Sequence, residues 1–280
     1  MFNDANNVLA LIGPDDRVLD VGGGVEVFPR ADAVLDLMPY AARQRAQLAH
    51  HTERFGPDDW FVGDVCSAAA WAPFADKSFD FVICSHVLED VRDPIYLCSQ
   101  LMRVGKAGYI ETPSRFRECA KASADDGVTG WEHHRWVMDV EGDTLVFTQK
   151  NPWVHRFDYL GDHRRHYLSQ HAHQFTAVHW VGGFDVVERA QKGSPTETEN
   201  LFLFYDQYDY ATPPPLHRIA HAAPRGRTFE WLTDFQLPIE RTCSPQEVLA
   251  RHRARPGGPG GAAASPAPSL LTRLRRLAQG

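Results

Sequence analysis

The stretch Val18–Gly24, which reads Val-Leu-Asp-Val-Gly-Gly-Gly, constrains the fold of this chain more than any other. A short apolar run that ends in glycines is typical of a buried parallel strand entering a tight loop. Glycine has no Cβ atom, so such a loop can adopt positive φ and lets a ligand approach the backbone closely. The stretch therefore predicts an α/β fold with a ligand site at the end of its first strand.

A second short apolar run, Ala33–Leu37, carries Asp36 near its end. In open α/β sheets, ligands bind beyond the carboxyl ends of the strands. An acid after the second strand accepts hydrogen bonds from ribose hydroxyls. The position of Asp36 therefore favours a nucleotide-like ligand over a plain turn at the glycines.

The first 112 residues alternate between predicted strands and helical stretches. Further strands are expected at 60–64, 79–84 and 109–111, and helices at 1–16, about 40–55, 67–71 and 94–104, with a turn at 105–108. Such alternation is typical of βαβ units and a parallel sheet. Polar side chains then meet at one edge of the sheet, because strand ends carry Asp20, Asp36, Asp64, Ser85, His86 and Glu111.

The pattern changes to β-hairpins after Pro113. One hairpin is expected between 135–140 and 144–149, a second between 176–181 and 184–188, and one more strand at 200–205. Residues 115–130 are polar and loop-like, and a capping box predicts a helix over 244–253. Residues 255–268 consist almost entirely of Pro, Gly, Ala and Ser, which predicts a flexible linker before a short basic helix over 269–279.

Composition excludes several classes of function. The chain has 29 basic and 36 acidic residues, so its net charge of −7 gives no field that would favour nucleic acid. Its apolar runs are too short to span a bilayer, and no signal segment opens it. The five cysteines are odd in number and lack CxxC spacing, which favours reduced thiols in the cytoplasm.

The block Pro73–Pro94, with the glycine loop, Asp36 and the triplet Gly63-Asp64-Val65, resembles the class I S-adenosylmethionine-dependent methyltransferases. The nearest subgroup is the broad small-molecule set called type 11, and the resemblance covers roughly residues 15–112. It implies an α/β, Rossmann-like, mostly parallel seven-stranded sheet between helices, with S-adenosylmethionine over the strand ends. We expect a core over 1–112, a β-rich acceptor-binding region over 113–206 that completes the sheet, an irregular extension over 207–254, and a linker and tail over 255–280.

The resemblance also implies roles for individual residues. It places Asp20, Gly22 and Gly24 around the methionine part of the cofactor. It places Asp36 on the ribose hydroxyls, and the residues around the adenine are Leu37, Asp64 and Val65. Ser85 and His86 then line the site next to the methyl group.

The chain departs from the family at two places. Asp20 and Asp36 are only 16 positions apart (36 − 20), which leaves no room for the usual helix between the first two strands. The connection over 22–32 must be a loop or a single turn, so any helix dipole at the cofactor is reduced. Asp90 stands where the family often has histidine, a position that usually supports the following helix.

Methyl transfer needs alignment of nucleophile and methyl, and a base if the nucleophile is a hydroxyl. The candidate catalytic residues are His86, Glu111 and His133. Glu111 can instead pair with Arg135 or cap a loop. His133 and His134 are adjacent, and in an extended segment they face opposite ways, so only one of them is expected in a given site.

Histidines are dense after residue 150. His163 with His166, or His171 with His173, offer ligands for a metal, but no cysteine or carboxylate completes a known four-ligand spacing, so no metal is assigned. Aromatic residues of the same region either wall an acceptor pocket or form the core of a β-subdomain.

The sequence thus predicts a cytoplasmic methyltransferase that uses S-adenosylmethionine and a small-molecule acceptor, such as a natural-product or glycan intermediate, with a mild preference for O-methylation. It predicts no nucleic-acid partner and no transmembrane segment, and it leaves the oligomeric state open. The alternatives are a catalytically silent methyltransferase-like scaffold, a metal-dependent enzyme using the histidine cluster and, more remotely, a nicotinamide enzyme.

Overall fold

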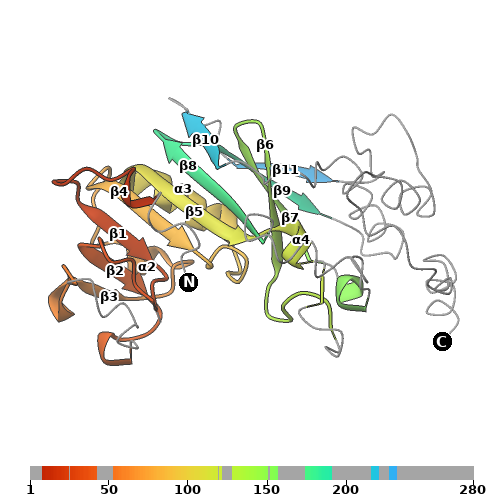
Figure 1. Ribbon diagram of the computed structural model, residues 1–280, viewed down its shortest axis with the longest axis horizontal. Helices are drawn as coiled ribbons and strands as arrows, with labels where there is room; N and C mark the ends of the chain where they lie inside the picture. The colour runs from red at the N-terminus through yellow and green to blue at the C-terminus, as the bar shows by residue number, and fades with distance from the viewer. Residues whose placement is uncertain are drawn as a thin grey trace, which may run out of the picture.

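The computed structural model describes residues 8–24, 26–42, 53–118, 120–121, 128–150, 152–156, 174–190, 216–220 and 227–231. Within this part of the chain the strands form two sheets, which Figure 1 shows. The main sheet has seven strands and the second sheet has four. Side chains of both sheets meet in one continuous hydrophobic core.

The main sheet has the strand order β10-β8-β5-β4-β1-β2-β3. Its strands are β1 (Val18–Val21), β2 (Ala33–Asp36), β3 (Trp60–Val62), β4 (Phe79–Ser85), β5 (Gly105–Pro113), β8 (Phe175–Val181) and β10 (His217–Ala220). The neighbours from β3 to β5 are all parallel, whereas β8 runs antiparallel to β5 and parallel to β10. The predicted Rossmann-like, mostly parallel seven-stranded sheet is confirmed.

β4 lies at the centre of this sheet, and its burial explains why its sequence reads as a nearly continuous apolar run. Phe79, Phe81, Val82, Ile83 and Cys84 are each at most 2% exposed. Strands of a parallel sheet are covered on both faces, so alternation of apolar and polar residues disappears.

The second sheet has the order β11-β9-β7-β6. Its strands are β6 (Trp136–Glu141), β7 (Thr144–Gln149), β9 (Asp185–Ala190) and β11 (Arg227–Trp231). β6 and β7 form the first predicted hairpin, in which Glu141 lies opposite Thr144. β9 runs parallel to both β7 and β11.

The second predicted hairpin is wrong in its pairing, although both of its strands exist. β8 pairs with β5 and β10 in the main sheet, whereas β9 pairs with β7 and β11 in the second sheet. The chain changes sheets at Gly182, which has φ of 79° and donates its N–H to the Lys106 carbonyl at 2.9 Å. Trp180 and Phe184, both fully buried, contact each other on either side of this change. Each strand gains a partner in a different sheet, and both bury apolar side chains in the shared core.

The helices are few in the described residues. They are α2 (Ala68–Trp71), α3 (Pro94–Val104), α4 (Arg115–Glu118) and the 3₁₀ turns η1 (Tyr40–Ala42), η2 (Pro57–Asp59) and η3 (Pro152–Arg156). α3 has the predicted bounds: the Asp93 carboxylate accepts the Tyr96 N–H at 2.8 Å, and Pro94 occupies the first helical position. Its buried side chains belong to the core that joins both sheets.

Three predicted elements differ in their limits. Residues 105–108 are already part of β5, not a turn, because α3 leads directly into the strand. The expected helix over 40–55 is a single 3₁₀ turn at Tyr40–Ala42 in its described part. Residues 115–118, expected in a loop, form α4 and bury Glu118 completely.

The connection from β1 to β2 is a loop, as its length predicts. Phe28 lies in this loop, is fully buried, and packs with Val18, Phe81 and Ile83 of the main sheet. Asp32 N–H donates to the Val18 carbonyl at 2.8 Å and brings the chain directly back into β2. The connection is too short for a helix, and the buried Phe28 side chain packs against the sheet in its place.

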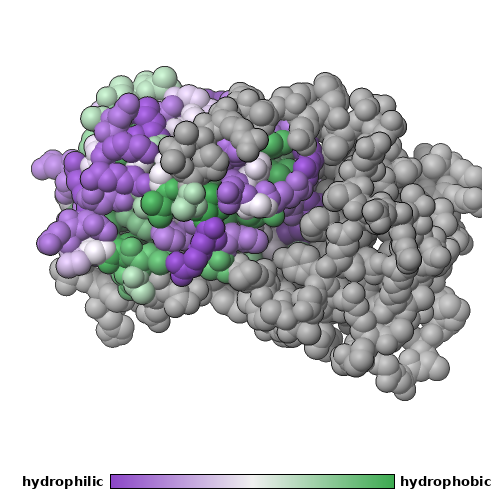
Figure 2. Space-filling view, turned by 90° about the horizontal axis from the view of Figure 1, so that it is seen from above, coloured by the Kyte–Doolittle hydropathy of each residue, from purple (hydrophilic) through white to green (hydrophobic). Residues whose placement is uncertain are grey.

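Several predictions fall outside the described residues: the strand at 200–205, the helices over 244–253 and 269–279, the linker over 255–268, and the histidines at 163, 166, 171 and 173. The space-filling view in Figure 2 shows hydrophilic side chains over much of the described surface, with apolar residues in smaller areas between them. Among the described helices, none has the length and apolar character needed to cross a membrane.

Candidate functional site

The glycine loop after β1 has a shape that only glycine permits at Gly22. This residue has φ of 78°, and a Cβ atom placed on it would lie 2.2 Å from Val87 Cγ2. A Cβ on Gly23 would lie 2.6 Å from Asp20 Oδ2, which already accepts the Phe28 N–H at 2.7 Å. The loop is therefore folded tightly over the end of β1.

Asp20 lies with its side chain buried against this loop and accepts a hydrogen bond from it. Its side chain is 1% exposed, and burial raises the pKa of its carboxyl to about 7. The buried carboxylate and its bond to Phe28 hold the glycine backbone in place. Because Asp20 is buried, it would act on a ligand indirectly, by holding the loop in its conformation.

Asp36, at the end of β2, joins the two strand ends. Its Oδ2 accepts the Gly24 N–H at 2.8 Å, and its Oδ1 accepts the Met38 N–H at 2.7 Å. Each carboxylate oxygen has two lone-pair sites, so one site on each oxygen is left after these bonds. The geometry suits two neighbouring hydroxyls of a ribose.

Apolar side chains lie exposed beside Asp36. Leu37 is 73% exposed, Met38 is 40% exposed and Val62 is 59% exposed. Asp64 follows β3, is half-exposed, and forms an ion pair with Arg92, which lowers the pKa of its carboxyl. An apolar surface next to an exposed carboxylate suits the faces and the amino group of an adenine ring.

Val65, which the resemblance places beside the adenine, is a largely buried residue, and its contact with the ring stays a prediction. Its side chain is 8% exposed and belongs to the main core, and its carbonyl oxygen accepts the Trp71 Nε1–H at 2.8 Å. Most of Val65 therefore packs inward, which places it under the half-exposed Asp64.

The ends of β4 and β5 carry the strongest electrostatic coupling of the sheet edge. His86 Nε2 lies 3.2 Å from Glu111 Oε1, and His86 Nδ1 lies 3.2 Å from Glu89 Oε1. Ser85 Oγ donates to Glu111 Oε1 at 3.3 Å, and Tyr109 donates its hydroxyl to Glu111 Oε2 at 2.7 Å. Both carboxylates are at most 2% exposed, whereas the imidazole is 27% exposed. The imidazole is thus the group of this set that faces outward.

The backbone at His86 is strained to reach this position. Its φ is 56°, and its N–H donates to the Glu111 carbonyl at 2.8 Å. Burial lowers the pKa of His86, but its hydrogen bonds with the Glu111 and Glu89 carboxylates outweigh burial and raise the pKa to about 9. Burial raises the pKa of Glu89. At neutral pH His86 is therefore protonated, and its two ring N–H groups face the carboxyl groups of Glu89 and Glu111.

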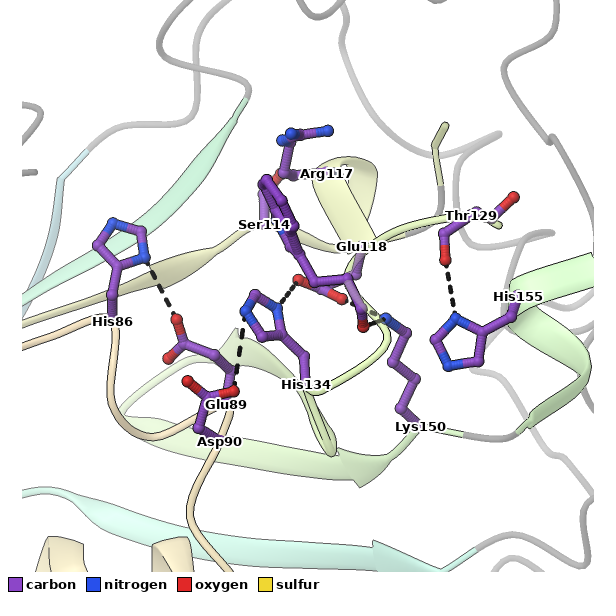
Figure 3. Close-up of polar contacts among 11 residues, drawn as sticks. His86, Glu89, Asp90, Ser114, Arg117, Glu118, Thr129, His134, Lys150 and His155 are labelled. Atoms are coloured by element: carbon purple, nitrogen blue, oxygen red, sulfur yellow. Dashed lines mark hydrogen bonds and ion pairs between the residues drawn. The ribbon is translucent and has the colours of Figure 1, made fainter. Parts of the chain in front are cut away.

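A second polar cluster, which sequence reasoning missed, lies next to the first. His134 Nδ1 lies 2.5 Å from Glu118 Oε1, and Lys150 Nζ donates to Glu118 Oε2 at 2.6 Å. Figure 3 shows these residues beside the His86–Glu89 pair. Lys150 and Glu118 are each 1% exposed in their side chains. A charged residue expected in a loop gives no sequence signal that it will be buried and paired.

His133, a predicted catalytic residue, lies with this second cluster. Its ring and that of His134 are 4.5 Å apart and meet edge to face. The expectation that the two histidines face opposite ways is wrong, because residues 132–133 form a turn before β6. A catalytic role for His133 stays a prediction.

The aromatic residues after Pro113 are expected either to wall an acceptor pocket or to form the core of a β-subdomain, and Trp131 and Trp136 differ in this respect. Trp136 is 8% exposed in the shared core, where its Nε1–H donates to the Val91 carbonyl at 2.9 Å. Trp131 is 41% exposed, and the Arg117 guanidinium lies 4.7 Å over its ring. Trp136 is therefore a core residue, and Trp131 belongs to the surface beside the second cluster.

The sequence of the main sheet matches a known domain family. Residues 19–110 match the family model described as a methyltransferase domain. Over 98 residues the chain is 39% identical to the demethylmenaquinone methyltransferase of Renibacterium salmoninarum, a match that spans 34% of this chain and 39% of the relative. The chain thus covers well under half the length of this curated relative.

Solved structures resemble the chain more distantly. An S-adenosylmethionine-dependent methyltransferase from Mesorhizobium loti is 18% identical, with 53% of this chain and 65% of that chain covered and a TM-score of 0.32. A putative methyltransferase from Bacillus halodurans is 18% identical, with 44% and 54% covered and a TM-score of 0.33. At these TM-scores the likeness is slight, and the assignment rests on the sequence match.

Residues 19–110 are therefore similar to a methyltransferase domain, and this match supports the S-adenosylmethionine-dependent methyltransferase that the glycine loop and the Pro73–Pro94 block predict.

Proposed function

We propose that the protein transfers a methyl group from S-adenosylmethionine to a small-molecule acceptor at the carboxyl edge of its main sheet. One observation carries this proposal: the glycine loop, Asp36 and the His86–Glu111 pair, which come from separate strands, meet at one edge of the sheet, and all but Glu111, the next residue after it, lie in the segment that matches a methyltransferase domain. Such convergence at strand ends is where ligands bind in open α/β sheets.

The residues present fit the cofactor. Gly22, Gly23 and Gly24 place no side chains over the end of β1, and Asp36 keeps lone pairs for two hydroxyls. Leu37 and Val62 offer exposed apolar contacts for a flat ring, with Asp64 beside them as an acceptor. S-adenosylmethionine supplies an electrophilic methyl group on a sulfonium, so the protein has to align it with the nucleophile.

The group formed by His86, Glu89 and Glu111 takes up the acceptor's proton in this proposal. Its imidazolium already carries one proton at neutral pH, so the available basic site is a carboxylate. Glu89 Oε2 is buried without a hydrogen-bond partner among the described residues, and the pKa of Glu89 is raised. A buried carboxylate with a raised pKa directly behind the outward-facing His86 is a suitable general base. Glu111 then positions His86, and His86 lines the site.

Three finer features of the proposal rest on sequence and on relatives. The Renibacterium relative is a demethylmenaquinone methyltransferase, which supports a small-molecule acceptor. O-methylation is favoured because the edge carries a basic group, and the net charge of −7 disfavours nucleic acid as the acceptor. A natural-product or glycan intermediate and a cytoplasmic location stay predictions.

Isothermal titration with S-adenosylmethionine and S-adenosylhomocysteine tests the proposal. Wild type is expected to show saturable binding of one equivalent. Asp36→Ala should weaken it about 10- to 100-fold, since hydrogen bonds to a charged group contribute about 1.5–3 kcal/mol. The fold should be retained in this variant, which circular dichroism checks.

Asp32→Ala is the matched control. Asp32 also ties the same loop, because its Oδ2 accepts the Val18 N–H at 2.9 Å and binds Arg30, but it lies at the opposite end of β2. Its removal should loosen the loop and leave the dissociation constant unchanged. Equal weakening in both variants would show that loop stability, and not a ribose contact, controls binding. No heat in wild type with either compound would favour the silent scaffold instead.

A further inference from the structure

Three side chains in and beside the second polar cluster can ligate a metal, of which His134 is buried. Asp90, His133 and His134 each offer one ligand atom, and these atoms all lie within 4.8 Å of one another. Two imidazoles and one carboxylate form a donor set that suits Zn²⁺ and similar divalent transition metals. The three come from segments far apart in the sequence, so no ligand spacing in the sequence reveals them.

One carboxylate oxygen of Asp90 lacks a hydrogen-bond partner among the described residues. Its Oδ1 is buried and has no hydrogen-bond partner among the described residues, and it lies 3.8 Å from His134 Nε2, beyond hydrogen-bond reach. A buried carboxylate oxygen without a partner is costly in a folded protein. A cation between Asp90 and His134 would satisfy it.

His134 already has the arrangement of a metal ligand. Its Nδ1 is bound to Glu118, which leaves Nε2 directed toward Asp90, as the dashed lines in Figure 3 show. Metal-binding histidines almost always donate their second nitrogen to a carboxylate or a carbonyl, which fixes the ring and the tautomer. Glu118 is itself held by Lys150 and by burial. The ring is thus oriented before any ion arrives.

The backbone holds the two segments of the cluster together. The Arg135 and Trp136 N–H groups donate to the Glu89 carbonyl at 2.6 and 3.2 Å, and the Trp136 indole donates to the Val91 carbonyl. Asp90 therefore lies between two anchored residues, directly opposite the histidine pair. A site whose backbone is already fixed by hydrogen bonds loses less conformational entropy on binding an ion than a flexible site does.

We propose that Asp90, His133 and His134 bind one divalent transition metal ion, with Glu118 as the outer partner of His134. Small side-chain rotations bring the three donors to the distance of about 2.0–2.2 Å that Zn²⁺ requires. Asp90 and His133 are exposed, so the fourth position is open to solvent or to a polar acceptor. The site goes beyond the methyl-transfer proposal and needs neither cofactor nor acceptor to form.

Titration of the chelator-treated full chain with ZnCl₂, followed by calorimetry, tests the proposal. Wild type should bind one equivalent that is lost in Asp90→Asn and in His133→Gln. The loss should exceed the roughly 10- to 100-fold drop that removal of an outer partner causes. His133 is exposed and Asp90→Asn keeps the size of a partly exposed side chain, so the variants should keep the wild-type melting temperature. Replacement of Zn²⁺ by Co²⁺ should give visible absorption bands in wild type that these variants lack.

His155→Gln is the matched control for the other histidines of the chain. Its Nδ1–H donates to the Thr129 carbonyl at 2.9 Å, outside the cluster. This variant should still bind one equivalent of Zn²⁺ and should still show the Co²⁺ absorption bands. An isotherm that is the same in wild type, Asp90→Asn and His133→Gln would overturn the proposal, whether zinc then binds elsewhere or not at all. Because no S-adenosylmethionine is present, the outcome is independent of the methyl-transfer proposal.

Discussion

Two regions of the sheet edge use buried carboxylates in opposite ways. At the glycine loop, Asp20 and Asp36 accept hydrogen bonds from backbone N–H groups. Beyond β4 and β5, Glu111 and Glu118 pair with histidine and lysine side chains. The first arrangement fixes the shape of a backbone, and the second fixes the positions of charges.

The difference teaches which region should respond to pH. Peptide N–H groups do not titrate, so the loop responds to pH only through the carboxylates that accept them, of which Asp20 has a pKa that burial raises to about 7. The imidazoles do titrate, and His86, between two carboxylates, gains and loses a proton as the pH changes. Changes to the loop should therefore act on backbone strain, and changes to the clusters on buried charge.

Glu118→Gln should have the largest effect. It leaves the Lys150 ammonium buried without its counter-ion, which typically costs about 3–5 kcal/mol in the free energy of unfolding. Burial raises the pKa of Glu118, but bonds to His134 and Lys150 outweigh burial and lower it. In wild type, ionised Glu118 therefore contributes to the free energy of unfolding above its unfolded pKa near 4.5. This contribution is lost as the pH falls through the lower folded pKa. Urea unfolding at pH 7 measures the cost.

Glu141→Gln is the control for this variant. Glu141 pairs with Arg189 between β6 and β9, but its side chain is 45% exposed, so its loss should cost at most about 1 kcal/mol. Adding Lys150→Met to Glu118→Gln should recover much of the stability, because the unpaired charge is removed. Equal costs for Glu118→Gln and Glu141→Gln would mean that burial gives the first pair no special weight.

Gly22→Ala should rank second, at about 3 kcal/mol. The substitution combines the strain of positive φ with a contact between the new methyl group and Val87. Gly142→Ala separates these two causes, since Gly142 has φ of 60° and nothing within 4 Å of a Cβ. It should cost about 1 kcal/mol. Thermal unfolding compares the variants, and the double change Gly22→Ala with Val87→Ala should fall between them.

His86→Asn should rank third, after Glu118→Gln and Gly22→Ala, and should have the strongest pH dependence. The pKa of His86 is raised from 6.5 to about 9, so its contribution is complete below pH 6.5 and is lost as pH rises through 9. The variant should cost about 2–3 kcal/mol at pH 6 and close to nothing above pH 9.5. Asparagine tolerates the positive φ at this position. Unfolding measured across this pH range gives the profile.

His179→Gln tests the sign of this dependence. Burial lowers the pKa of His179, so wild type should lose stability relative to this variant as pH falls below 6.5. The two histidines should thus give pH profiles of opposite slope. Parallel profiles would show that the carboxylates around His86 do not control its charge.

Local sequence predicted most of the parallel half. The apolar runs at β1, β2 and β4 predicted buried strands, and Asp93 with Pro94 predicted the start of α3. The 16-residue spacing predicted a loop in place of a helix. These signals depend on neighbours along the chain, so they are readable without the fold.

The candidate site was predictable only in part. The sequence alone determined that Asp36, His86 and Glu111 stand at strand ends, and hence that they share one edge. It gave no sign that Glu118 is buried on Lys150, that His133 and His134 turn toward Asp90, or that β8 and β9 separate into two sheets. Only the tertiary structure decided these, because charge pairing and strand pairing depend on which distant segments the shared core brings together.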